Sequence, residues 1–404
     1  MASLSLPGGT TTVVDGYYGC SGGVVNGSGK AIVVGGGIGG LAAAIALIRR
    51  GWRVEVLERA SEIGEVGSGI SLWANGIRAL DALGVGAAVR AAGLMEAEGG
   101  IRDRSGRWLS KTDTVEMARR YGPLIAIRRT DLFAILSAAL PEGTLRLGVT
   151  VVGVENLGSS VKITHGEGVS EADLVIGADG IRSVVREALW PAARGPRYAG
   201  YTAWRMITGP LDFAPPGGEI WGRGERFGVV PLPDGCAYLF AVADAPEGER
   251  HPDREFEQVR ARFANWPSPI PETLAHVDPT SVLHHDIYDL PPLAGFVRGR
   301  VALLGDAAHA MTPNLGQGAN QAIEDAVTLA AVLAHDPVPE ALAAYDRLRR
   351  ARTAGIARRS RLIGAVAQWS STPATTVRDT VIRLSPSSAV LRSLDSVLNW
   401  QPPE

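Results

Sequence analysis

The sequence predicts an α/β fold in which a Rossmann-like dinucleotide-binding domain is interleaved with a mostly antiparallel sheet domain and followed by C-terminal helices. Three observations lead to this prediction. Residues 31–60 have the pattern strand, glycine turn, helix, strand, and two later segments, 174–186 and 300–333, again place a buried strand before a glycine-rich turn and a helix. Residues 196–288 contain alternating, aromatic-rich stretches separated by Gly and Pro, which is typical of antiparallel strands.

The first segment carries a nucleotide-binding signature. An apolar, β-branched run over residues 31–34 predicts a strand buried on both faces. Gly35, Gly37 and Gly40 follow it with the spacing G-x-G-x-x-G. In this arrangement the glycines permit a tight turn, close approach of the backbone to a pyrophosphate, and close packing of helix on strand.

The elements after the glycines complete the signature. We expect a helix over residues 41–50 with Gly51 as its left-handed cap, so that its N-terminal amides point toward phosphates. Glu58 ends the next strand about 20 residues after the glycines, where a carboxylate accepts hydrogen bonds from both ribose hydroxyls. The segment therefore predicts a bound adenine dinucleotide without a 2′-phosphate.

Composition excludes several other classes of protein. A chain of 404 residues can bury a large core, and a formal net charge of −2 offers no global field for nucleic acid or an anionic membrane. Cys20 and Cys236 match no metal or C-x-x-C spacing, and no apolar run approaches the ~20 residues of a membrane-spanning helix, so we expect a reduced cytoplasmic protein. Residues 1–28 lack the features of a signal peptide, and their Gly, Ser and Thr content indicates a flexible leader.

Two segments before the second glycine-rich turn also have the features of a ligand site. Residues 64–86 begin as a glycine loop and become a helix for which Asn75 is the expected N-cap. Arg128 and Arg129 precede a helix that is expected to start with Thr130 as its N-cap. Positive charge at a helix start opposes the helix dipole, so this arginine is either compensated by a surface ion pair or held toward an anionic ligand such as a cofactor.

The second glycine-rich turn has the sequence GADGIRSVVR, residues 177–186. Asp179 follows a buried strand, and Arg182 and Arg186 lie in the same turn region, which indicates a ligand-facing loop. In the sheet region that follows, Trp204 and Arg205 are adjacent on one strand and must point to opposite faces, so only one of them can face a pocket.

The third segment, residues 300–333, is the richest in candidate site residues. Asp306 follows a buried strand, Pro313 stiffens the next loop, and Gly316 and Gly318 open a long helix whose free amides can stabilise negative charge. His309 has no partner base or metal spacing, so we expect a hydrogen-bonded loop histidine rather than a ligand or base. Beyond Pro337 we expect amphipathic helices, with the arginines of residues 345–362 on a solvated face.

The three blocks GGGIGG with Glu58, GADGIRSVVR, and GDAAHAMTPNLGQGANQAIEDA resemble, in order and spacing, the single-component flavoprotein monooxygenases related to para-hydroxybenzoate hydroxylase. The GSGISLWANG segment and the YTAWR strand are most similar to the salicylate, urate and zeaxanthin-type branch of that family. The resemblance implies FAD at the first site and NADH or NADPH as a transient co-substrate. Its FAD-binding domain would comprise residues 29–75, 100–190 and 289–335; its substrate domain 76–99 and 191–288; and a helical segment 336–404.

The resemblance also assigns roles. Glu58 would hold the adenosine ribose, Arg128 or Arg129 the pyrophosphate region, and Asp306 the ribityl and pyrophosphate portion. Pro313 and the amides of residues 315–318 would line the flavin ring, and Arg205 is the candidate substrate-facing charge. The full cofactor set expected on these motifs is Gly35, Gly37, Ile38, Gly39, Gly40, Glu58, Arg59, Arg128, Asp179, Asp306, Gly316, Gln317, Gly318, Ala319 and Asn320, with Arg205, Pro313 and Gly316 as catalytic candidates.

The function implied is insertion of one oxygen atom from O2 into an electron-rich, aromatic or polycyclic small molecule through a flavin hydroperoxide, by a monomer or homodimer without a nucleic-acid or membrane partner. Epoxidation of an alkene, a non-oxygenating FAD oxidoreductase and a catalytically silent flavin-binding scaffold are the alternatives. A flavin-dependent halogenase of the same frame would carry W-x-W-x-I-P, and none of the nine tryptophans stands in W-x-W.

Overall fold

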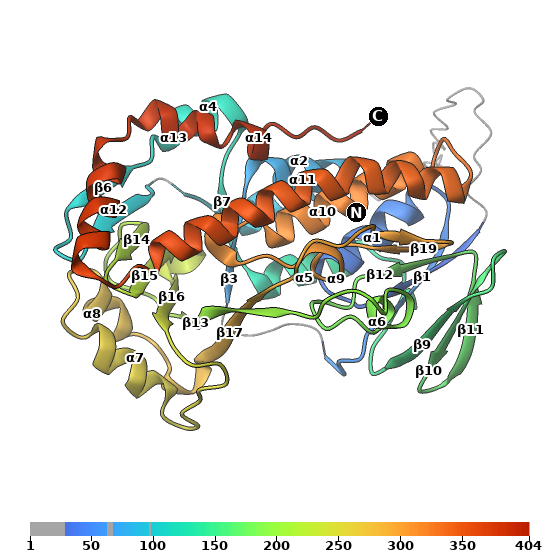
Figure 1. Cartoon of the computed structure of the whole chain (residues 1–404), viewed down its shortest axis with the longest axis horizontal. Helices are drawn as coiled ribbons and strands as arrows, with labels where there is room; N and C mark the ends of the chain where they lie inside the picture. Colours follow the sequence, from blue (N-terminus) through green and yellow to red (C-terminus); the bar gives the residue numbers. More distant parts are fainter. Residues whose placement is uncertain (1–28, 63–67, 97, 404) are drawn as a thin grey trace, which may run out of the picture.

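The computed structural model describes residues 29–62, 68–96 and 98–403. The predicted N-terminal leader, residues 1–28, and Cys20 lie outside the described residues. The predicted α/β architecture is confirmed, with a nucleotide-binding half on the right of Figure 1 and a second sheet on its left.

The first half is built on a six-stranded sheet in the order β18-β19-β12-β1-β2-β8. Its strands are parallel except for the edge strand β18. The bounds are β1 Lys30–Val34, β2 Arg53–Leu57, β8 Leu145–Arg146, β12 Leu174–Gly177, β18 Val297–Arg298 and β19 Val301–Leu303. Central strands of such a sheet are buried on both faces, which explains their continuous apolar runs.

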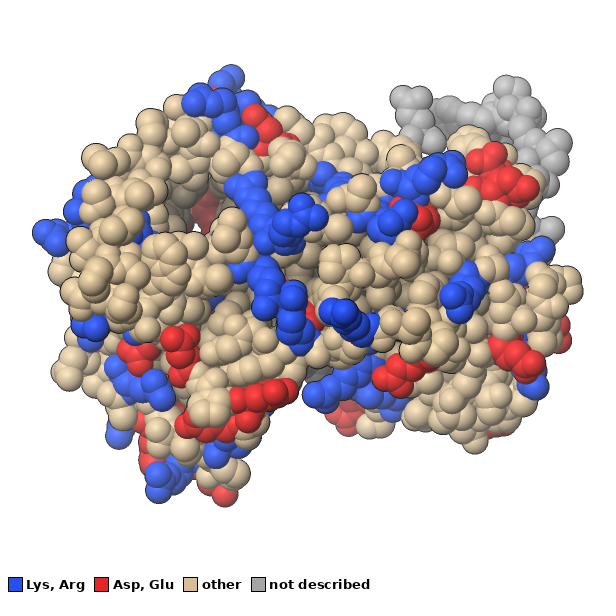
Figure 2. Space-filling model, in the orientation of Figure 1, with Lys and Arg blue, Asp and Glu red and all other residues tan. Residues whose placement is uncertain are grey.

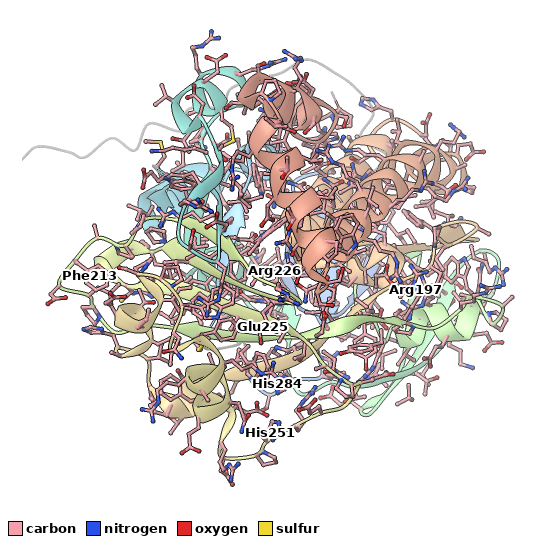
Figure 3. All side chains as sticks on the ribbon, turned by 60° about the vertical axis from the view of Figure 1, so that its left-hand side comes forward. Arg197, Phe213, Glu225, Arg226, His251 and His284 are labelled. Carbon is pink, nitrogen blue, oxygen red and sulfur yellow. The ribbon has the colours of Figure 1, made fainter. Side chains whose placement is uncertain are left out.

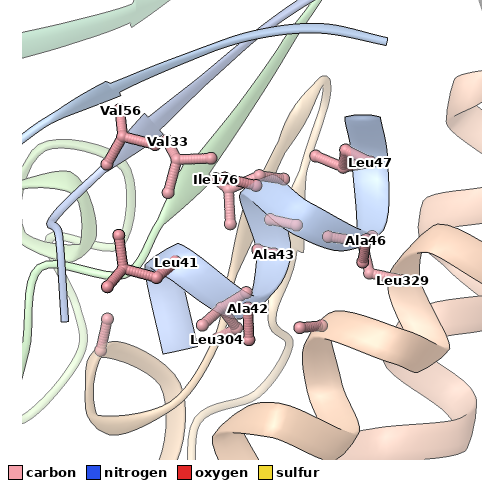
Figure 4. Packing of buried hydrophobic residues seen from close by; sticks show 14 of the residues in the cluster. Val33, Leu41, Ala42, Ala43, Ala46, Leu47, Val56, Ile176, Leu304 and Leu329 are labelled. Carbon is pink, nitrogen blue, oxygen red and sulfur yellow. The ribbon is translucent and has the colours of Figure 1, made fainter. Parts of the chain in front are cut away.

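Helix α1 (Ile38–Ile48) fills the space between this sheet and α10 (Gly318–Val332). Its alanines and leucines contact Val33 and Ile176 of the sheet on one side and Leu329 of α10 on the other, as Figure 4 shows. Small residues on α1 allow both neighbours to approach closely. The helix ends three residues before Gly51, which has a φ of +85°.

The second half is a seven-stranded sheet in the order β17-β13-β16-β15-β14-β5-β6. It is antiparallel apart from the β14 and β5 pair. The bounds are β5 Gly100–Asp103, β6 Trp108–Lys111, β13 Arg197–Ile207, β14 Gly218–Trp221, β15 Glu225–Pro231, β16 Ala237–Asp244 and β17 Leu283–Asp289. The expected helical interruption is α7 (Glu255–Phe263), which with α8 (Ile270–Leu274) covers one face of this sheet.

Two small antiparallel sheets complete the strands. One has the order β11-β10-β9 and the other β3-β7-β4. Their bounds are β9 Val151–Asn156, β10 Val161–His165, β11 Gly168–Ala172, β3 Gly69–Leu72, β7 Ile125–Arg128 and β4 Leu94–Met95. The β3-β7-β4 sheet touches the second half, because Ala126 of β7 packs with Tyr238 of β16.

The C-terminal helices join the two halves. Helix α11 crosses the molecule in front of α10, from the first sheet toward the second (Figure 1), and Lys and Arg gather over it on this face (Figure 2). The remaining helices are α2 Ala74–Ala82, α3 Gly86–Ala92, α4 Thr114–Tyr121, α5 Arg129–Ala138, α6 Val184–Leu189, α9 Asp306–His309, α11 Val338–Ala367, α12 Thr372–Leu384, α13 Ser387–Ser393 and α14 Asp395–Leu398, with short 3₁₀ turns η1 Pro233–Gly235, η2 Pro279–Ser281 and η3 Pro313–Leu315.

Three local predictions differ from the structure. Asn75 and Thr130 are not N-caps, because α2 and α5 begin one residue before each of them, and Asn75 is buried with its Nδ2 donating to Glu324. The predicted solvated face of α11 is wrong for Arg349, which is 1% exposed. Strand pairing places β5 and β6, within residues 100–111, in the second sheet.

Candidate functional site

The candidate site is a cavity of about 810 Å³ where the two halves meet, here called the central cavity. Its volume lies within the ~300–1,000 Å³ range of small-molecule and cofactor sites. The wall is formed by the glycine turn before α1, by β3, by the segments after β12 and β19, and by one face of the second sheet. Segments far apart in sequence therefore build one site.

The glycine turn has no room for side chains on one side and faces the cavity on the other. Gly35 has a φ of +104°, and a Cβ on Gly40 would lie 1.9 Å from the Gly35 oxygen. Gly37, Ile38 and Gly39 line the cavity, and a Cβ on Gly37 would meet no protein atom within 4 Å. The N-terminus of α1 thus opens onto space that protein does not fill, as binding of a pyrophosphate requires.

Glu58 lies beside this turn at the end of β2. Its carboxylate accepts hydrogen bonds from the amides of Gly36 at 2.6 Å and Ala60 at 2.8 Å. Arg59 follows it and is exposed. Neither residue is part of the cavity wall. Glu58 therefore contacts the glycine turn but lies at the rim of the site.

The second motif contributes backbone to the cavity rather than the carboxylate of Asp179. That carboxylate accepts from the Ser183 hydroxyl at 2.5 Å and from the Val185 amide at 3.1 Å, so it orders the start of α6. Burial raises the pKa of Asp179, and the hydrogen bond from Ser183 opposes the increase. Its neighbours Gly180 and Ile181 line the wall.

The third motif supplies an acid and a second helix N-terminus. Asp306 is exposed to the cavity but shielded from bulk solvent, and this enclosure raises the pKa of its carboxyl group against the opposing effects of His309 and Arg129. Five predicted residues line the same wall, namely Pro313, Gly316, Gln317, Gly318 and Ala319. A Cβ on Gly318 would meet no protein atom within 4 Å, so the start of α10, like that of α1, opens onto free space.

Asn320 is fully buried behind this wall and holds it in place. Its side chain accepts from the Trp73 amide at 3.0 Å and donates to the Gly316 oxygen at 2.8 Å and the Ser71 oxygen at 3.3 Å. These bonds join the α10 turn to β3 and the start of α2. Asn320 is therefore placed to order the loop rather than to contact a ligand.

A buried ionic network holds the third motif, residues 300–333, in place. Asp325 accepts from the Gly305 amide at 2.9 Å, contacts His309 Nε2 at 2.5 Å and accepts from Arg349 Nε at 2.6 Å. Although burial opposes its charged form, His309 and Arg349 hold the pKa of Asp325 below its ordinary value. The expectation of a hydrogen-bonded His309 is confirmed.

Arg128 and Arg129, at the junction of β7 and α5, lie in two different environments. Arg128 points away from the cavity wall, with its guanidinium 3.1 Å from Asp234 and beside the sulfur of Cys236. Arg129 lines the cavity. Arg128 is the last residue of β7 and Arg129 is the first residue of α5.

The second sheet presents two arginines to the cavity. Trp204 and Arg205 do point to opposite faces: Trp204 packs in the core against α7, and Arg205 lines the cavity with its guanidinium on the Tyr238 hydroxyl. Arg226 of β15 lines the same cavity although it is 2% exposed. It lies where the second sheet meets the C-terminal helices (Figure 3), bonded to Asn314 of η3 and 3.6 Å from Glu219.

Sequence reasoning missed Arg226, Tyr238 and Glu96, which line the cavity. Arg226 and Tyr238 stand on alternating strands, but the alternation alone did not say which face of the sheet was the inner one. Glu96 lies in the short connection after β4, for which no motif was available.

No group of three or more His, Cys, Asp or Glu side chains is arranged to hold a metal ion within the described part of the chain. Among the helices that the structure describes, none has both the length and the apolarity required to cross a membrane.

The sequence and the fold are both similar to those of known proteins. Residues 29–360 match the family described as FAD binding domain. The aurachin C monooxygenase/isomerase of Stigmatella aurantiaca is 39% identical over 368 residues, covering 89% of this chain and 95% of that protein. The 2-heptyl-3-hydroxy-4(1H)-quinolone synthase of Pseudomonas aeruginosa is 35% identical, covering 89% and 94%. The crystal structure of Klebsiella pneumoniae HpxO complexed with FAD and uric acid superposes with a TM-score of 0.86 at 28% identity, over 92% of this chain and 97% of that one.

Proposed function

The chain belongs to the FAD-binding domain family and is an FAD-dependent monooxygenase of the para-hydroxybenzoate hydroxylase type, and from this premise we propose that its substrate is a flat aromatic heterocycle with an ionisable N–H or O–H group. One observation carries the proposal. Arg226 is buried on the cavity wall, and its Nε has no hydrogen-bond partner among the described residues. A buried cationic donor of this kind is stabilised when an oxygen of a bound ligand completes its hydrogen bonds.

The residues around the central cavity are suited to binding FAD. The two helix N-termini at Gly37 and Gly318 open onto space that a Cβ would enter, which is what close approach of a phosphate or a ring to backbone requires. In our assignment the amides of residues 37–39 hold the pyrophosphate, Glu58 the ribose, and Asp306 the ribityl portion. The role expected of Arg128 or Arg129 goes to Arg129, which lines the cavity.

FAD, once reduced by NAD(P)H, supplies the activation of O2 and the transfer of one oxygen atom to an electron-rich carbon. The chain's part is to position the substrate and to exclude water. The sheet wall above the α10 turn is apolar, since its lining includes Ala203, Val229, Val230, Phe240, Val242 and Ile287. Arg205 and Arg226 place two cations on this wall, where an oxygen anion of the substrate is stabilised more strongly than in water.

The relatives narrow the class of compound. Their names refer to aurachin C, a 3-hydroxy-4(1H)-quinolone and uric acid. The quinolone and uric acid each have a planar ring system that contains nitrogen and presents carbonyl or hydroxyl oxygen at its edge. They suit a cavity with an apolar face and two arginines.

A panel of aurachin C, 2-heptyl-4(1H)-quinolone and uric acid tests the proposal. Each compound is incubated with holoenzyme, NADH or NADPH, and labelled oxygen gas, and the products are measured by mass spectrometry. We expect at least one product heavier by one labelled oxygen atom. NAD(P)H oxidation that yields only hydrogen peroxide with every member would contradict the proposed substrate class.

We also propose that the enzyme acts as a monomer or homodimer in the cytoplasm. The described cavity wall comes from one chain, so no second copy is needed to complete it, and Cys236 is a buried free thiol. Light scattering on the holoenzyme measures the assembly directly.

A further inference from the structure

Glu96 is a carboxyl group on the cavity wall with no role in the FAD assignment above. It follows β4, and its amide donates to the Leu124 oxygen at 3.0 Å, which fixes the backbone at this point. Its Oε1 accepts a hydrogen bond of 2.7 Å from the Ser71 hydroxyl of β3. The backbone of Glu96 is thus held next to β7 and its side chain is held by Ser71 of β3, on the wall of the cavity.

Three of the other carboxyl groups on the wall have cationic partners, and the fourth, Asp306, is assigned to FAD above. Glu98 is 2.9 Å from Lys111, Asp286 is 3.0 Å from Arg250, and Glu219 is 3.6 Å from Arg226. Each is balanced by a cation. Glu96 instead has the neutral Ser71 hydroxyl as its side-chain partner in the described structure.

Burial raises the pKa of Glu96 to about 7, and the hydrogen bond from Ser71 limits the increase. The titratable and charged groups on the surrounding elements are Glu98 with Lys111, Arg129, Asp306, and Tyr238 with Arg205. None of these groups lowers the pKa of Glu96 against the effect of burial. A carboxyl group of this pKa is divided between its two forms near neutral pH, which suits a proton acceptor.

A chain of contacts connects Glu96 to the Arg205 side of the cavity. Ser71 pairs with Ala126 in the β3 and β7 register, and Ala126 packs on Tyr238, whose hydroxyl accepts from Arg205. One end of this short path carries a proton acceptor and the other a cation, both on the same cavity.

Resting on the proposed function, we propose that Glu96 is the catalytic base that removes the N–H or O–H proton of the bound heterocycle before oxygen transfer. The substrate's N–H or O–H bond breaks, a new O–H bond forms on the Glu96 carboxylate, and the electron pair stays on the substrate. Arg205 and Arg226 stabilise that negative charge, and its delocalisation makes the ring carbon more electron-rich. The proton transfer involves no change in oxidation state.

The test compares wild type, Glu96→Gln, Ser71→Ala and the exposed-surface control Glu116→Gln, all as holoenzymes. With a panel compound that is turned over, we expect wild-type kcat/KM to fall below about pH 7, as Glu96 becomes protonated. Glu96→Gln is expected to lose on the order of 10²-fold in kcat/KM and to lose this acid limb. Ser71→Ala is expected to move the limb to higher pH, because the bond that lowers the pKa is gone. An unchanged rate and pH profile in Glu96→Gln would overturn the proposal.

A second measurement separates this inference from the proposed function. 3-Nitrophenol, whose ionised form is coloured and which is mostly neutral in free solution at pH 7.5, is titrated into each holoenzyme at pH 7.5, where the Glu96 carboxyl group is mostly ionised. We expect its difference spectrum to show the ionised form with wild type and Glu116→Gln, and the neutral form with Glu96→Gln. Failure of every panel compound would contradict the substrate class, and Glu96 would then be judged on this spectrum alone. Identical spectra for wild type and Glu96→Gln would contradict the assignment of Glu96 as the base. The absence of binding to both proteins counts as identical spectra.

Discussion

Arg226 shows how burial changes the role that a side chain can have. An arginine on an alternating strand is ordinarily a solvent-facing side chain, and its guanidinium is costly to bury without partners. Here it is bonded to Asn314 on the loop that opens α10 and lies 3.6 Å from Glu219, and its Nε is still unpartnered among the described residues. The side chain thus links the second sheet to the loop that opens α10, and in the proposed function its Nε is the donor to a ligand oxygen.

Replacing Arg226 with methionine should therefore weaken substrate use. The loss of a hydrogen bond to a charged group costs about 1.5–3 kcal/mol, so we expect kcat/KM to fall by roughly 10- to 150-fold. Steady-state kinetics with a panel compound measures this, together with flavin absorbance, which should show unchanged FAD content. Arg223→Met, on the same hairpin but exposed, is the control. Equal kinetics in the two variants would remove Arg226 from the substrate site.

At the scale of elements, the glycine turn shows two different reasons for a missing side chain. A Cβ at Gly40 would collide with the Gly35 oxygen at 1.9 Å, so Gly40 is required by packing of α1 on β1. A Cβ at Gly37 would meet no protein atom within 4 Å, and we propose that Gly37 is required by the ligand instead. The same motif contains a structural and a functional glycine.

The two alanine variants should separate these reasons. We expect Gly40→Ala to destabilise the apoprotein by about 1–3 kcal/mol or more, because overpacking displaces the helix. Gly37→Ala should leave apoprotein stability nearly unchanged and lower the affinity for FAD. Denaturant unfolding of the apoproteins and FAD titration measure the two effects. Loss of apoprotein stability in Gly37→Ala equal to that in Gly40→Ala would contradict this reading.

Helix α11 contributes a buried charge to the third motif. Arg349 Nε donates to Asp325 at 2.6 Å and Arg349 Nη1 donates to Glu324 at 2.5 Å, and all three side chains are almost completely buried. Removing one member of such a group leaves uncompensated buried charge. Because Asp325 also holds the Gly305 amide, the damage reaches the loop that carries Asp306.

We expect Arg349→Met to lower the free energy of unfolding by about 3–5 kcal/mol. Arg350→Met is the matched control, since Arg350 is exposed and pairs with Asp346 one turn away on the surface, where such pairs contribute about 0–1 kcal/mol. Denaturant unfolding of both holoenzymes provides the comparison. A loss of under 1 kcal/mol for Arg349→Met would show that the network is dispensable.

For the whole molecule, the cavity joins segments that are distant in the chain. The turn before α1, the loop after β12 and the loop before α10 come from three separate βα connections of one parallel sheet, and the opposite wall comes from the second sheet. The carboxyl ends of parallel strands meet at one edge, so their loops converge there. A ligand that contacts all of these loops stabilises the folded state of both halves.

FAD should therefore stabilise the chain as a unit. A ligand that binds only the folded state at 100 times its Kd adds about 2.7 kcal/mol to the free energy of unfolding. We expect FAD to produce such an increase with a single unfolding transition, and riboflavin, which lacks the pyrophosphate and adenosine, to produce much less at the same concentration. Thermal unfolding of the apoprotein with each compound measures this. Equal stabilisation by riboflavin would argue against the pyrophosphate and ribose contacts.

The sequence by itself determined the βαβ unit, the order of the three motifs, the antiparallel second sheet and the opposite orientations of Trp204 and Arg205. These features depend on local rules: hydrophobic period, glycine spacing and the alternation of side chains along a strand. Only the tertiary structure decided which of Arg128 and Arg129 faces the cavity, that Asn75 and Arg349 are buried, and that Arg226, Tyr238 and Glu96 share a wall. Those outcomes depend on which surfaces of distant elements are pressed together, and local pattern carries no information about the partner across the interface.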